Sequence, residues 1–428
     1  MVGGGLAGLA AAVALQREGV RVELFERSRL LGGRATSFEI DGVEVDNGQH
    51  VFLACCTEFI DFVDSVGMRD ALYLQDRFDA LVFGGGVASR LRATSLPAPF
   101  HLLPSLLTYR HLSVRERIRF LAGIARMLYR VAPRTHRQSF AAFLAQNRQR
   151  APQMRAFWEP FFIPALNAPL DCVSQDDGEF VLARAFLRDA RAARFGWSRV
   201  PLAHIADAAA RRLDSVHLST AVNEVRIGSD TRIELRVKDL WHSFDAAVLA
   251  VTPPQLARLL DNPERYGARG TGAYRAYPIV DVHLWHDRSR LDFEFAALID
   301  SPVQWIFAKA PGYLCCSMSA ADALAGRTTT ELTQRAWQDV VRNVPAMRTA
   351  TLQRSAVTRS PDATYVARFD AARTQTSTVA ANLAIAGSWT DTGWPDTMES
   401  AVRSGRAAAK SLQFAPNAAT RDAVSYAS

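Results

Sequence analysis

Three glycines near the start of the chain restrict its fold more than any other feature. They have the spacing G-x-G-x-x-G and are Gly3, Gly5 and Gly8. A helical stretch rich in alanine and leucine follows as far as Leu15, and residues 20–25 then read as a strand that ends at the acid Glu26. This order of turn, helix, strand and acid predicts a Rossmann-type α/β unit that binds a dinucleotide.

Each part of this unit has a physical role in holding the dinucleotide. The first glycine permits a tight turn, the second lets the backbone approach the pyrophosphate, and the third lets helix and strand pack closely. Leu6 and Ala7 open the helix, whose free N–H groups and positive dipole end face the phosphates. Glu26 is placed to accept hydrogen bonds from a ribose diol.

The first fifteen residues also allow other readings. Residues 6–15 form an apolar run such as a secretory signal contains. No basic region precedes the run, glycine interrupts it and no convincing cleavage site follows, so we reject a signal peptide. Only Met1 and Val2 precede the glycines, so the expected first strand is almost absent. Either the start is placed too late or this strand is truncated.

A second glycine turn follows the ribose acid directly. Residues 27–34 read R-S-R-L-L-G-G-R, with Arg27 and Arg34 at the ends and Gly32 and Gly33 in the turn. The turn is placed to reach the pyrophosphate and the flavin side of a longer cofactor. It resembles the Gly-Gly-Arg turn of the FAD-dependent amine oxidase and phytoene desaturase superfamily. That resemblance, and not the spacing, implies FAD in place of NAD.

Composition limits the partners and the compartment. The chain of 428 residues is 49% hydrophobic, which suffices for two domains, and its basic residues exceed its acidic residues by seven. No block of Lys and Arg of the nucleic-acid type occurs, so we expect the FAD phosphates or a membrane surface as the anionic counterpart. The five cysteines are odd in number and form no C-x-x-C, which predicts reduced, buried thiols in a cytoplasmic protein without a disulfide or metal role.

A polar loop follows a predicted hairpin. Residues 36–40 and 43–46 read as two strands around an Asp-Gly turn, and they lead into the string D-N-G-Q-H-V. Such a loop between a strand and a helix is typical either of a functional site or of a solvated turn. The string is similar to that of the squalene-associated branch of the superfamily. The candidate catalytic residues that it contributes are Asp46, Gln49 and His50.

The middle of the chain changes character twice. Between residues 91 and 131, apolar residues spaced by three and four alternate with arginines, among them Arg115, Arg117 and Arg119. A helix on an anionic bilayer shows this pattern, and so does a core helix with a basic solvent face. We expect peripheral docking on the inner face of the cell membrane. Residues 138–189 then read as aromatic-rich helices that either form core or line an apolar tunnel of a substrate domain.

Later segments predict a return to the first domain and then a sheet. Residues 216–227 read as strand, turn and strand, and in the superfamily a valine backbone contacts the adenine at such a point, which here is Val222. Residues 244–251 read as a buried parallel strand. Residues 277–307 alternate with period two, which predicts an antiparallel sheet over the flavin, with His283 on a sheet face or at the surface and not a catalyst.

The second strong signal lies at residues 382–402. A buried strand ends at Gly387, a polar loop containing Asp391 follows, and a helix begins near Thr397 and Met398, where its N-terminus would stabilise reduced flavin. The string is similar to A-G-D-W-T-D-T-G-x-P of the hydroxysqualene dehydroxylase branch. Ser388 stands where the superfamily usually has an acid that contacts the cofactor, so the carboxylate contact is lost.

These patterns together predict an α/β chain with a discontinuous Rossmann-type FAD-binding domain and an inserted mixed α+β substrate domain. The expected segments are the FAD domain at 1–85, a helical substrate and docking region at 86–200, the FAD domain again at 201–255, an antiparallel sheet at 256–355, the FAD domain at 356–412 and a disordered tail at 413–428.

The resemblance also implies an activity. It implies reductive removal of the hydroxyl of hydroxysqualene, a C30 isoprenoid lipid, to give squalene in squalene and hopanoid biosynthesis, with an unknown electron donor. Asp46, Gln49, His50 and Asp391 are the candidates for donating the proton or for orienting the groups that do. A carotenoid-type desaturase, an amine oxidase and an FAD- or lipid-binding module without turnover remain as alternatives.

Overall fold

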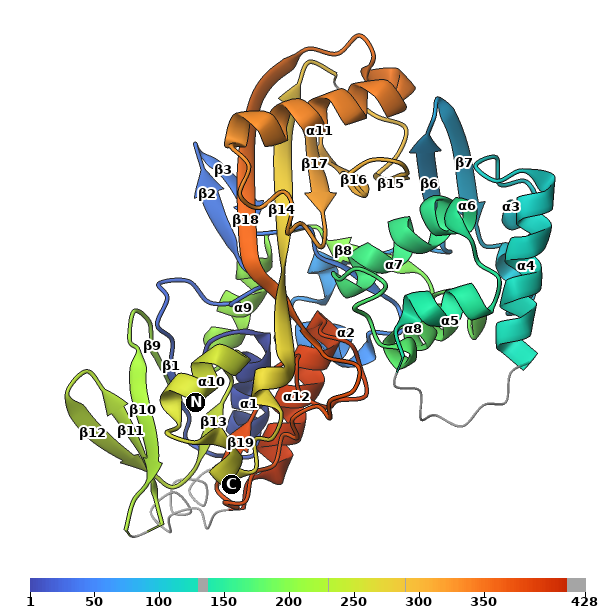
Figure 1. Ribbon diagram of the computed structural model, residues 1–428. Helices are drawn as coiled ribbons and strands as arrows, with labels where there is room; N and C mark the ends of the chain where they lie inside the picture. The colour runs from blue at the N-terminus through green and yellow to red at the C-terminus, as the bar shows by residue number, and fades with distance from the viewer. Residues whose placement is uncertain (130–137, 230, 289, 414–428) are drawn as a thin grey trace, which may run out of the picture.

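The computed structural model describes residues 1–129, 138–229, 231–288 and 290–413. Two long strands connect a lower unit, which holds the N-terminus, with an upper sheet and a group of helices beside it (Figure 1). The predicted tail lies outside the described residues from position 414 onward. None of the helices in the described part is long and apolar enough to cross a membrane.

A parallel sheet assembled from distant parts of the chain forms the centre of the lower unit. Its paired strands are β1 (Glu23–Phe25) with β9 (Ser215–His217), and β13 (Ala247–Leu249) with β19 (Leu383–Ile385). Val2 joins the two pairs, because it bridges in parallel to Phe25 and to Leu249. Val2 therefore lies in the place expected for the first strand. The sheet confirms the discontinuous Rossmann-type domain, since it combines segments near residues 2, 24, 216, 248 and 384.

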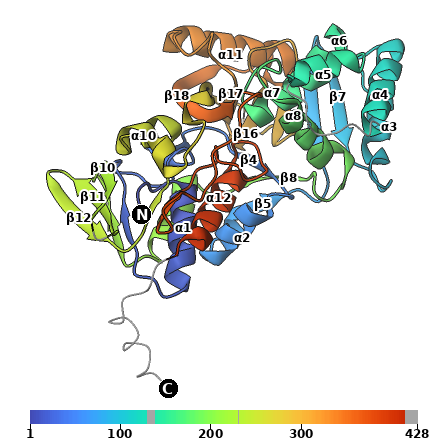
Figure 2. The same cartoon turned by 60° about the horizontal axis from the view of Figure 1, so that its bottom comes forward.

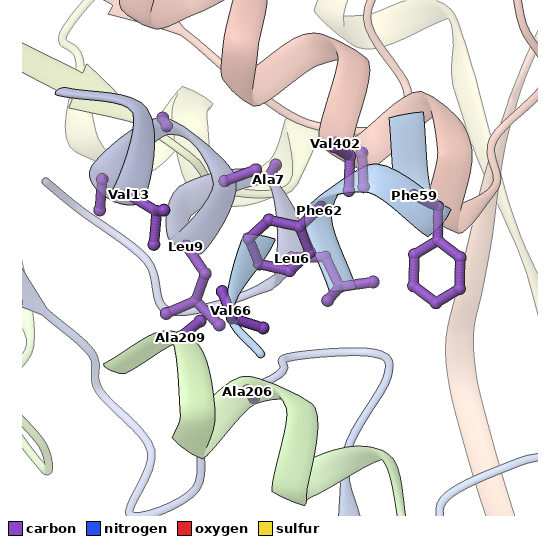
Figure 3. Close-up of a cluster of buried hydrophobic side chains, with 14 of the residues drawn as sticks. Leu6, Ala7, Leu9, Val13, Phe59, Phe62, Val66, Ala206, Ala209 and Val402 are labelled. Carbon is purple, nitrogen blue, oxygen red and sulfur yellow. The ribbon is translucent and has the colours of Figure 1, made fainter. Parts of the chain in front are cut away.

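Four helices pack together beside this sheet. They are α1 (Leu6–Arg17), α2 (Thr57–Ser65), α9 (Leu202–Ala210) and α12 (Met398–Ser411). Side chains from all four meet in one apolar cluster, in which Leu9 of α1 lies near Val66 and Ala209 (Figure 3). A Cβ on Gly405 of α12 would lie 2.1 Å from the carbonyl oxygen of Ala7. The glycine therefore lets the first and the last helix of the chain pack in direct backbone contact.

A mixed sheet of seven strands forms the upper unit. In spatial order its strands are β18 (Leu352–Ala367), β14 (Tyr274–His286), β17 (Tyr313–Met318), β16 (Trp305–Ala310), β15 (Phe295–Leu298), β6 (Asp79–Gly84) and β7 (Val87–Arg92). All neighbours are antiparallel except β15 and β6. Helix α11 (Thr329–Asn343) lies across one face, where Val280, Val282 and Leu284 point into the core beneath it (Figure 1).

The strand pairing differs from the predicted segments at two places. Residues 79–84 were expected in the FAD-binding domain, but they pair with β15 in the upper sheet. Strand β18 likewise begins in the upper sheet and runs beside β14 to residue 367, beyond the expected boundary at 356. The alternation of apolar residues along a strand does not identify the strand with which it pairs. Both segment boundaries were therefore predicted from position along the chain alone.

A helical region adjoins the β6–β7 edge. Its elements are α3 (Leu103–Leu107), α4 (Val114–Tyr129), α5 (Phe140–Gln146), α6 (Ala151–Gln153), the π-helical turn η3 (Met154–Trp158), α7 (Glu159–Leu166), α8 (Gln175–Leu182) and the π-helical turn η4 (Ala183–Leu187). The predicted aromatic residues pack on one another as core: Phe157 lies with its ring centroid 4.7 Å from Phe120 and 5.3 Å from Phe186.

Smaller elements complete the fold. They are the hairpin β2 (Ser37–Ile40) and β3 (Val43–Asp46); the sheet of β4 (Val51–Leu53), β8 (Phe195–Ser198) and β5 (Leu72–Leu74); the sheet of β10 (Val222–Ile227), β11 (Ile233–Val237) and β12 (Leu240–Phe244); helix α10 (Pro253–Leu259); and the single turns η1 (Arg69–Ala71), η2 (Phe100–Leu102), η5 (Pro263–Tyr266), η6 (Thr271–Ala273) and η7 (Pro345–Met347). The hairpin at 36–46 is confirmed.

Turning the molecule shows α1, α12 and α2 side by side and α10 apart from the helical region (Figure 2).

Candidate cofactor and active site

The first glycine turn is sterically fixed. A Cβ on Gly3 would lie 2.3 Å from the carbonyl oxygen of Ala250, and the φ of Gly3 is +102°. A Cβ on Gly8 would lie 1.9 Å from the carbonyl oxygen of Gly3. Both positions therefore exclude a side chain for reasons internal to the protein, as the predicted tight turn and close helix packing require.

Gly5 differs from these two glycines. The nearest atoms to a Cβ built on Gly5 are the carbonyl oxygen of Gly32 and the Cα of Gly33, both at 3.9 Å. No side chain in the described residues caps the N-terminus of α1, which begins after Gly5. Leu6 and Ala7 are buried, so they offer backbone N–H groups and not side chains. The open space and the uncapped helix end fit a pyrophosphate.

Glu26 lies at the edge of this turn. Its carboxylate oxygens accept hydrogen bonds from the backbone N–H groups of Gly4 and Ser28, each at 2.7 Å. These bonds fix the carboxylate and leave further lone pairs for a ribose diol. The backbone N–H of Thr220 donates to the Glu26 carbonyl at 2.8 Å, which brings the segment that enters Val222 beside the ribose acid. Arg27 is exposed to solvent.

The second glycine turn lies directly against the first. The N–H of Gly32 donates to the carbonyl oxygen of Gly4 at 2.9 Å, and a Cβ on Gly33 would lie 3.1 Å from the Cα of Gly5. Gly32 and Gly33 both have positive φ, at +92° and +60°. Glycine is therefore needed in this turn both for its backbone conformation and for its contact with the phosphate-binding loop.

Arg34 connects the second turn to the C-terminal motif. Its guanidinium donates to both carboxylate oxygens of Asp396, at 2.9 and 3.2 Å, and to the hydroxyl of Ser388 at 2.5 Å. Asp396 also accepts a hydrogen bond from the backbone N–H of Tyr365 at 2.6 Å. We call Arg34, Tyr365, Ser388 and Asp396 the clasp. The clasp brings together segments more than 350 residues apart in sequence.

The C-terminal motif is held rigidly behind the clasp. The hydroxyl of Ser400 donates to the carbonyl oxygen of Ser388 at 2.6 Å, and the N–H of Gly387 donates to the hydroxyl of Ser404 at 2.8 Å. Thr397 caps helix α12, which begins at Met398 as predicted. The hydroxyl of Ser388 accepts its hydrogen bond from Arg34 and so belongs to the clasp.

Asp396→Asn is expected to lower the free energy of unfolding by about 2 kcal/mol, because it leaves the half-buried Arg34 charge without a counter-ion. Asp261→Asn, in an exposed pair with Arg265, is the control and should change stability by less than about 0.5 kcal/mol. Chemical denaturation of the flavin-loaded protein measures both. Equal stabilities of the two variants would contradict a structural role for the clasp.

The predicted polar loop is tied to the clasp and to the upper sheet. The imidazole of His50 lies 2.9 Å from the carbonyl oxygen of Gly48 and 3.1 Å from that of Arg34, and the side-chain amide of Asn47 donates to the Arg34 carbonyl at 2.9 Å. Burial lowers the pKa of His50, and the charge of Asp46 opposes this shift. Gln49 is half-buried in the same loop.

Asp46 is engaged through both of its carboxylate oxygens. One carboxylate oxygen accepts from the hydroxyl of Ser37 at 2.7 Å and from the N–H of Leu202 at 3.0 Å. The other lies 3.5 Å from the ammonium of Lys309. Asp391, the fourth candidate, is exposed and accepts a hydrogen bond from Gln375 at 2.9 Å. The structure thus brings Asp46, Gln49 and His50 together and holds Asp391 at the surface.

Asp281 on β14 is a buried acid that the sequence reasoning missed. Its side chain has no exposed surface, and its Oδ2 has no hydrogen-bond partner among the residues that the structure describes. That oxygen lies 3.4 Å from where a Cβ on Gly48 would be. Burial raises the pKa of Asp281 to about 7, and the charge of Asp46 adds to this rise. Hydrogen bonds from the side chain of Ser317 and the backbone N–H of Gln49, and the charge of Lys309, act in the opposite direction. This acid keeps its proton close to neutral pH.

His283 lies two residues further along the same face. It is buried and not at the surface. On the neighbouring strand β18 the hydroxyl of Ser360 donates to the carbonyl oxygen of Asn47 at 3.2 Å, so the polar loop lies against the same sheet. Its ring nitrogens lie 2.7 Å from the Tyr313 hydroxyl and 3.4 Å from the Thr358 hydroxyl. Burial lowers the pKa of His283 to about 4, so the ring is neutral at neutral pH.

One sequence signal could have identified a missed residue. The chain has only three lysines, at 238, 309 and 410, among 50 basic residues, which singles out Lys309, the lysine beside Asp46. The alternation of β14 places Asp281 and His283 on one face, but an antiparallel sheet can leave one face in solvent, so the pattern does not predict their burial. Asp396 gave no such signal, because only the folded chain brings it to Arg34.

A small cavity opens between the clasp and the helical region. It is about 260 Å³ with its open side included, and its walls include Tyr365 and Asp396 of the clasp and Leu166 of α7. The hollow is far smaller than a ligand pocket, and it shows only that part of the clasp lies beside the helical region.

Comparisons with known proteins agree with this architecture. The family model described as flavin containing amine oxidoreductase matches residues 6–413. Hydroxysqualene dehydroxylases are similar over the full length: that of Zymomonas mobilis subsp. mobilis is 24% identical, covering 96% of this chain and 97% of that protein, and that of Rhodopseudomonas palustris is 27% identical, covering 96% of each. A probable zeta-carotene desaturase of Synechococcus elongatus is 23% identical, covering 96% and 98%.

Solved structures show the same fold. A putative protoporphyrinogen oxidase from Exiguobacterium sp. 255-15 matches with a TM-score of 0.71 and 16% identity, covering 96% of this chain and 97% of that one. Cyclohexylamine oxidase from Brevibacterium oxydans matches with a TM-score of 0.70 and 17% identity, with the same coverage. The two glycine turns, the uncapped helix and Glu26 fit FAD as the cofactor, and the chain belongs to the flavin-containing amine oxidoreductase family.

Proposed function

We propose that this protein is an FAD-dependent oxidoreductase that removes the hydroxyl of hydroxysqualene to give squalene, in squalene and hopanoid biosynthesis. The full-length likeness to the hydroxysqualene dehydroxylases carries the proposal. The D-N-G-Q-H-V string supports it, because Asn47 and His50 of that loop contact Arg34 of the clasp.

The proposed reaction replaces a carbon–oxygen bond of the substrate with a carbon–hydrogen bond. The carbon–oxygen bond breaks, and the hydroxyl takes up a proton and leaves as water. A new carbon–hydrogen bond forms at the same carbon. FAD, when bound in its reduced form, supplies the hydride with its two electrons, and a reductant of unknown identity must return them. The protein must hold the lipid away from water and deliver one proton.

The geometry separates the candidate proton sources. Asp46 is engaged in accepting hydrogen bonds and in the contact with Lys309. Burial lowers the pKa of His50, whose two ring nitrogens lie beside carbonyl oxygens. Asp281 keeps its proton near neutrality and lies directly under the loop of Gly48 and Gln49. We therefore propose Asp281 as a further source of the proton beside Asp46, His50 and Asp391, with Gln49 as an orienting group in the loop above it.

Anaerobic incubation of the reduced, flavin-loaded protein with hydroxysqualene tests the reaction. The expected result is one squalene formed per flavin reoxidised, seen by mass analysis and by the return of the oxidised flavin spectrum. Unchanged substrate with stable reduced flavin would refute the proposal. A colourless purified protein that binds lipid would instead identify a carrier.

A second candidate function is carotenoid-type desaturation, favoured by the full-length match to a probable zeta-carotene desaturase. It runs the flavin in the opposite direction, so the oxidised protein is reduced by the substrate. Incubation of the oxidised protein with zeta-carotene separates the two: bleached flavin with a new double bond supports desaturation. Bleaching by an amine would point to an amine oxidase instead.

We also propose that the protein works in the reducing cytoplasm. All five cysteines are free thiols, including the adjacent pairs Cys55–Cys56 and Cys315–Cys316. Four of the five are buried, as predicted, and Cys172 is half-buried. Free thiols in this number are typical of a reducing compartment.

A further inference from the structure

Exposed large apolar side chains are concentrated in one stretch of the helical region. Six of the twelve in the described structure fall between residues 96 and 128, and we call them the docking face: Leu96, Phe100, Leu107, Val114, Ile118 and Leu128. They lie on η2, α3, α4 and the loop before η2. Figure 1 shows α3 and α4 at the outer edge of the molecule, far from the parallel sheet of the lower unit. Such a concentration of apolar surface marks an interaction site.

Helix α4 gives this face its shape. Val114 and Ile118 lie one turn apart and are both 63% exposed, whereas Phe120 and Met127 point into the core. A Cβ on Gly123 would lie 1.9 Å from the side-chain nitrogen of Gln149, so the inner side of α4 is in close contact with the loop after α5. The outward apolar stripe is therefore held rigidly on the core and is not available to fold inward.

Exposed arginines lie beside the apolar stripe of α4, about a third of a turn around the helix. Arg115, Arg119 and Arg126 are exposed on α4, and Arg110 is exposed just before it. The one acid of α4, Glu116, accepts a hydrogen bond from the N–H of Ser113 at 2.7 Å and so serves the start of the helix. Apolar residues flanked by guanidinium groups are complementary to an anionic bilayer, where the apolar groups enter the interface and the arginines meet phosphates.

The same charges argue against a second copy of this chain as the occupant. In a two-fold symmetric contact the same surface lies on both sides, so the arginines of α4 from both copies would be gathered in one interface. Like charges at such a contact oppose association. A bilayer rich in anionic lipid turns those arginines into a favourable contribution, and it accepts apolar side chains without requiring a complementary protein surface.

We infer that the docking face binds the protein peripherally to an anionic phospholipid bilayer. Behind this face an unbroken series of aromatic contacts runs inward: Phe120 to Phe157 at 4.7 Å, Phe157 to Phe161 at 5.1 Å, and Phe161 to Trp305 on β16 at 5.5 Å between ring centroids. The apolar interior thus extends from the docking face to the upper sheet. The inference stands on the surface alone and does not depend on which reaction the protein catalyses.

Flotation with lipid vesicles tests the inference. The flavin-loaded protein is mixed with vesicles of phosphatidylcholine alone or with one third phosphatidylglycerol. The test variant carries Arg115→Glu, Arg119→Glu and Arg126→Glu; Arg117 is left intact because its guanidinium donates to the carbonyl oxygen of Leu107. The control carries Arg258→Glu, Arg265→Glu and Arg269→Glu, which are exposed near α10 and change the net charge by the same amount. Flavin absorbance and thermal unfolding show that each variant is folded.

The wild type and the control are expected to float with the anionic vesicles and to stay behind with the neutral ones. The α4 variant should lose at least about 100-fold in partition coefficient, at about 1 kcal/mol for each arginine removed from the membrane surface. A second variant, Val114→Ser with Ile118→Ser, should also bind more weakly. Equal flotation of the α4 variant and the control would overturn the inference, as would association of the wild type into dimers through this face without vesicle binding.

Discussion

Gly5→Ala is expected to give a folded protein that has lost most of its flavin. The backbone at Gly5 has a φ of −75° and a ψ of 175°, which alanine adopts freely, and the nearest atoms to its Cβ are 3.9 Å away. The methyl group would instead occupy the space where the pyrophosphate approaches the helix. We expect flavin affinity to fall by about 10- to 100-fold, since overpacking costs about 1–3 kcal/mol.

Gly8→Ala should behave differently, because its Cβ collides with the Gly3 carbonyl oxygen inside the protein. Moving that backbone is expected to cost about 3 kcal/mol or more of folding free energy, with or without flavin. Gly326→Ala is the control, since a Cβ there meets no atom within 4 Å and its φ is not positive. Flavin titration followed by absorbance, with thermal unfolding of each apoprotein, separates the three cases. A Gly5→Ala protein with normal flavin affinity would refute this assignment of the phosphate site.

Asp281→Asn is expected to stabilise the protein at neutral pH and to have much less effect at pH 4. In the unfolded chain the aspartate has its ordinary pKa of 3.8, and in the folded protein burial raises that pKa to about 7. The folded state therefore holds a proton that the unfolded state has lost between these two values. The stability that the protonated acid contributes is fully present below about pH 4 and is lost as the pH rises to about 7, at about 1.4 kcal/mol per pH unit.

Over the whole interval this loss amounts to at most about 4 kcal/mol, because three pH units separate the two pKa values. Asparagine does not ionise, so the variant should gain on the wild type across this window and then stay level above pH 7. Denaturant unfolding of both proteins at each pH unit from 4 to 8 measures the difference, and Asp261→Asn serves as the exposed control. A difference that does not change with pH would show that Asp281 is ionised throughout in the folded protein.

The local structure around the cofactor could be predicted from the sequence because its constraints are local. The glycine spacing, the helix after it and Glu26 specify a turn whose steric demands lie within a few residues. The hairpin at 36–46 and the start of α12 after Thr397 are likewise determined by turn and capping residues in their own neighbourhood. Resemblance added the flavin, and the family match confirmed it.

The tertiary structure alone decided which distant residues meet. Arg34 was visible as part of a glycine turn, but its counter-ion Asp396 lies 362 positions away and nothing in the sequence pairs them. Asp281 and His283 looked like the polar side of a strand, and both are buried in the folded chain, where the loop of Asn47 lies against the same sheet. Ionisation and ion pairing depend on what lies within a few ångströms in space, whereas a sequence pattern reports only what lies within a few residues along the chain.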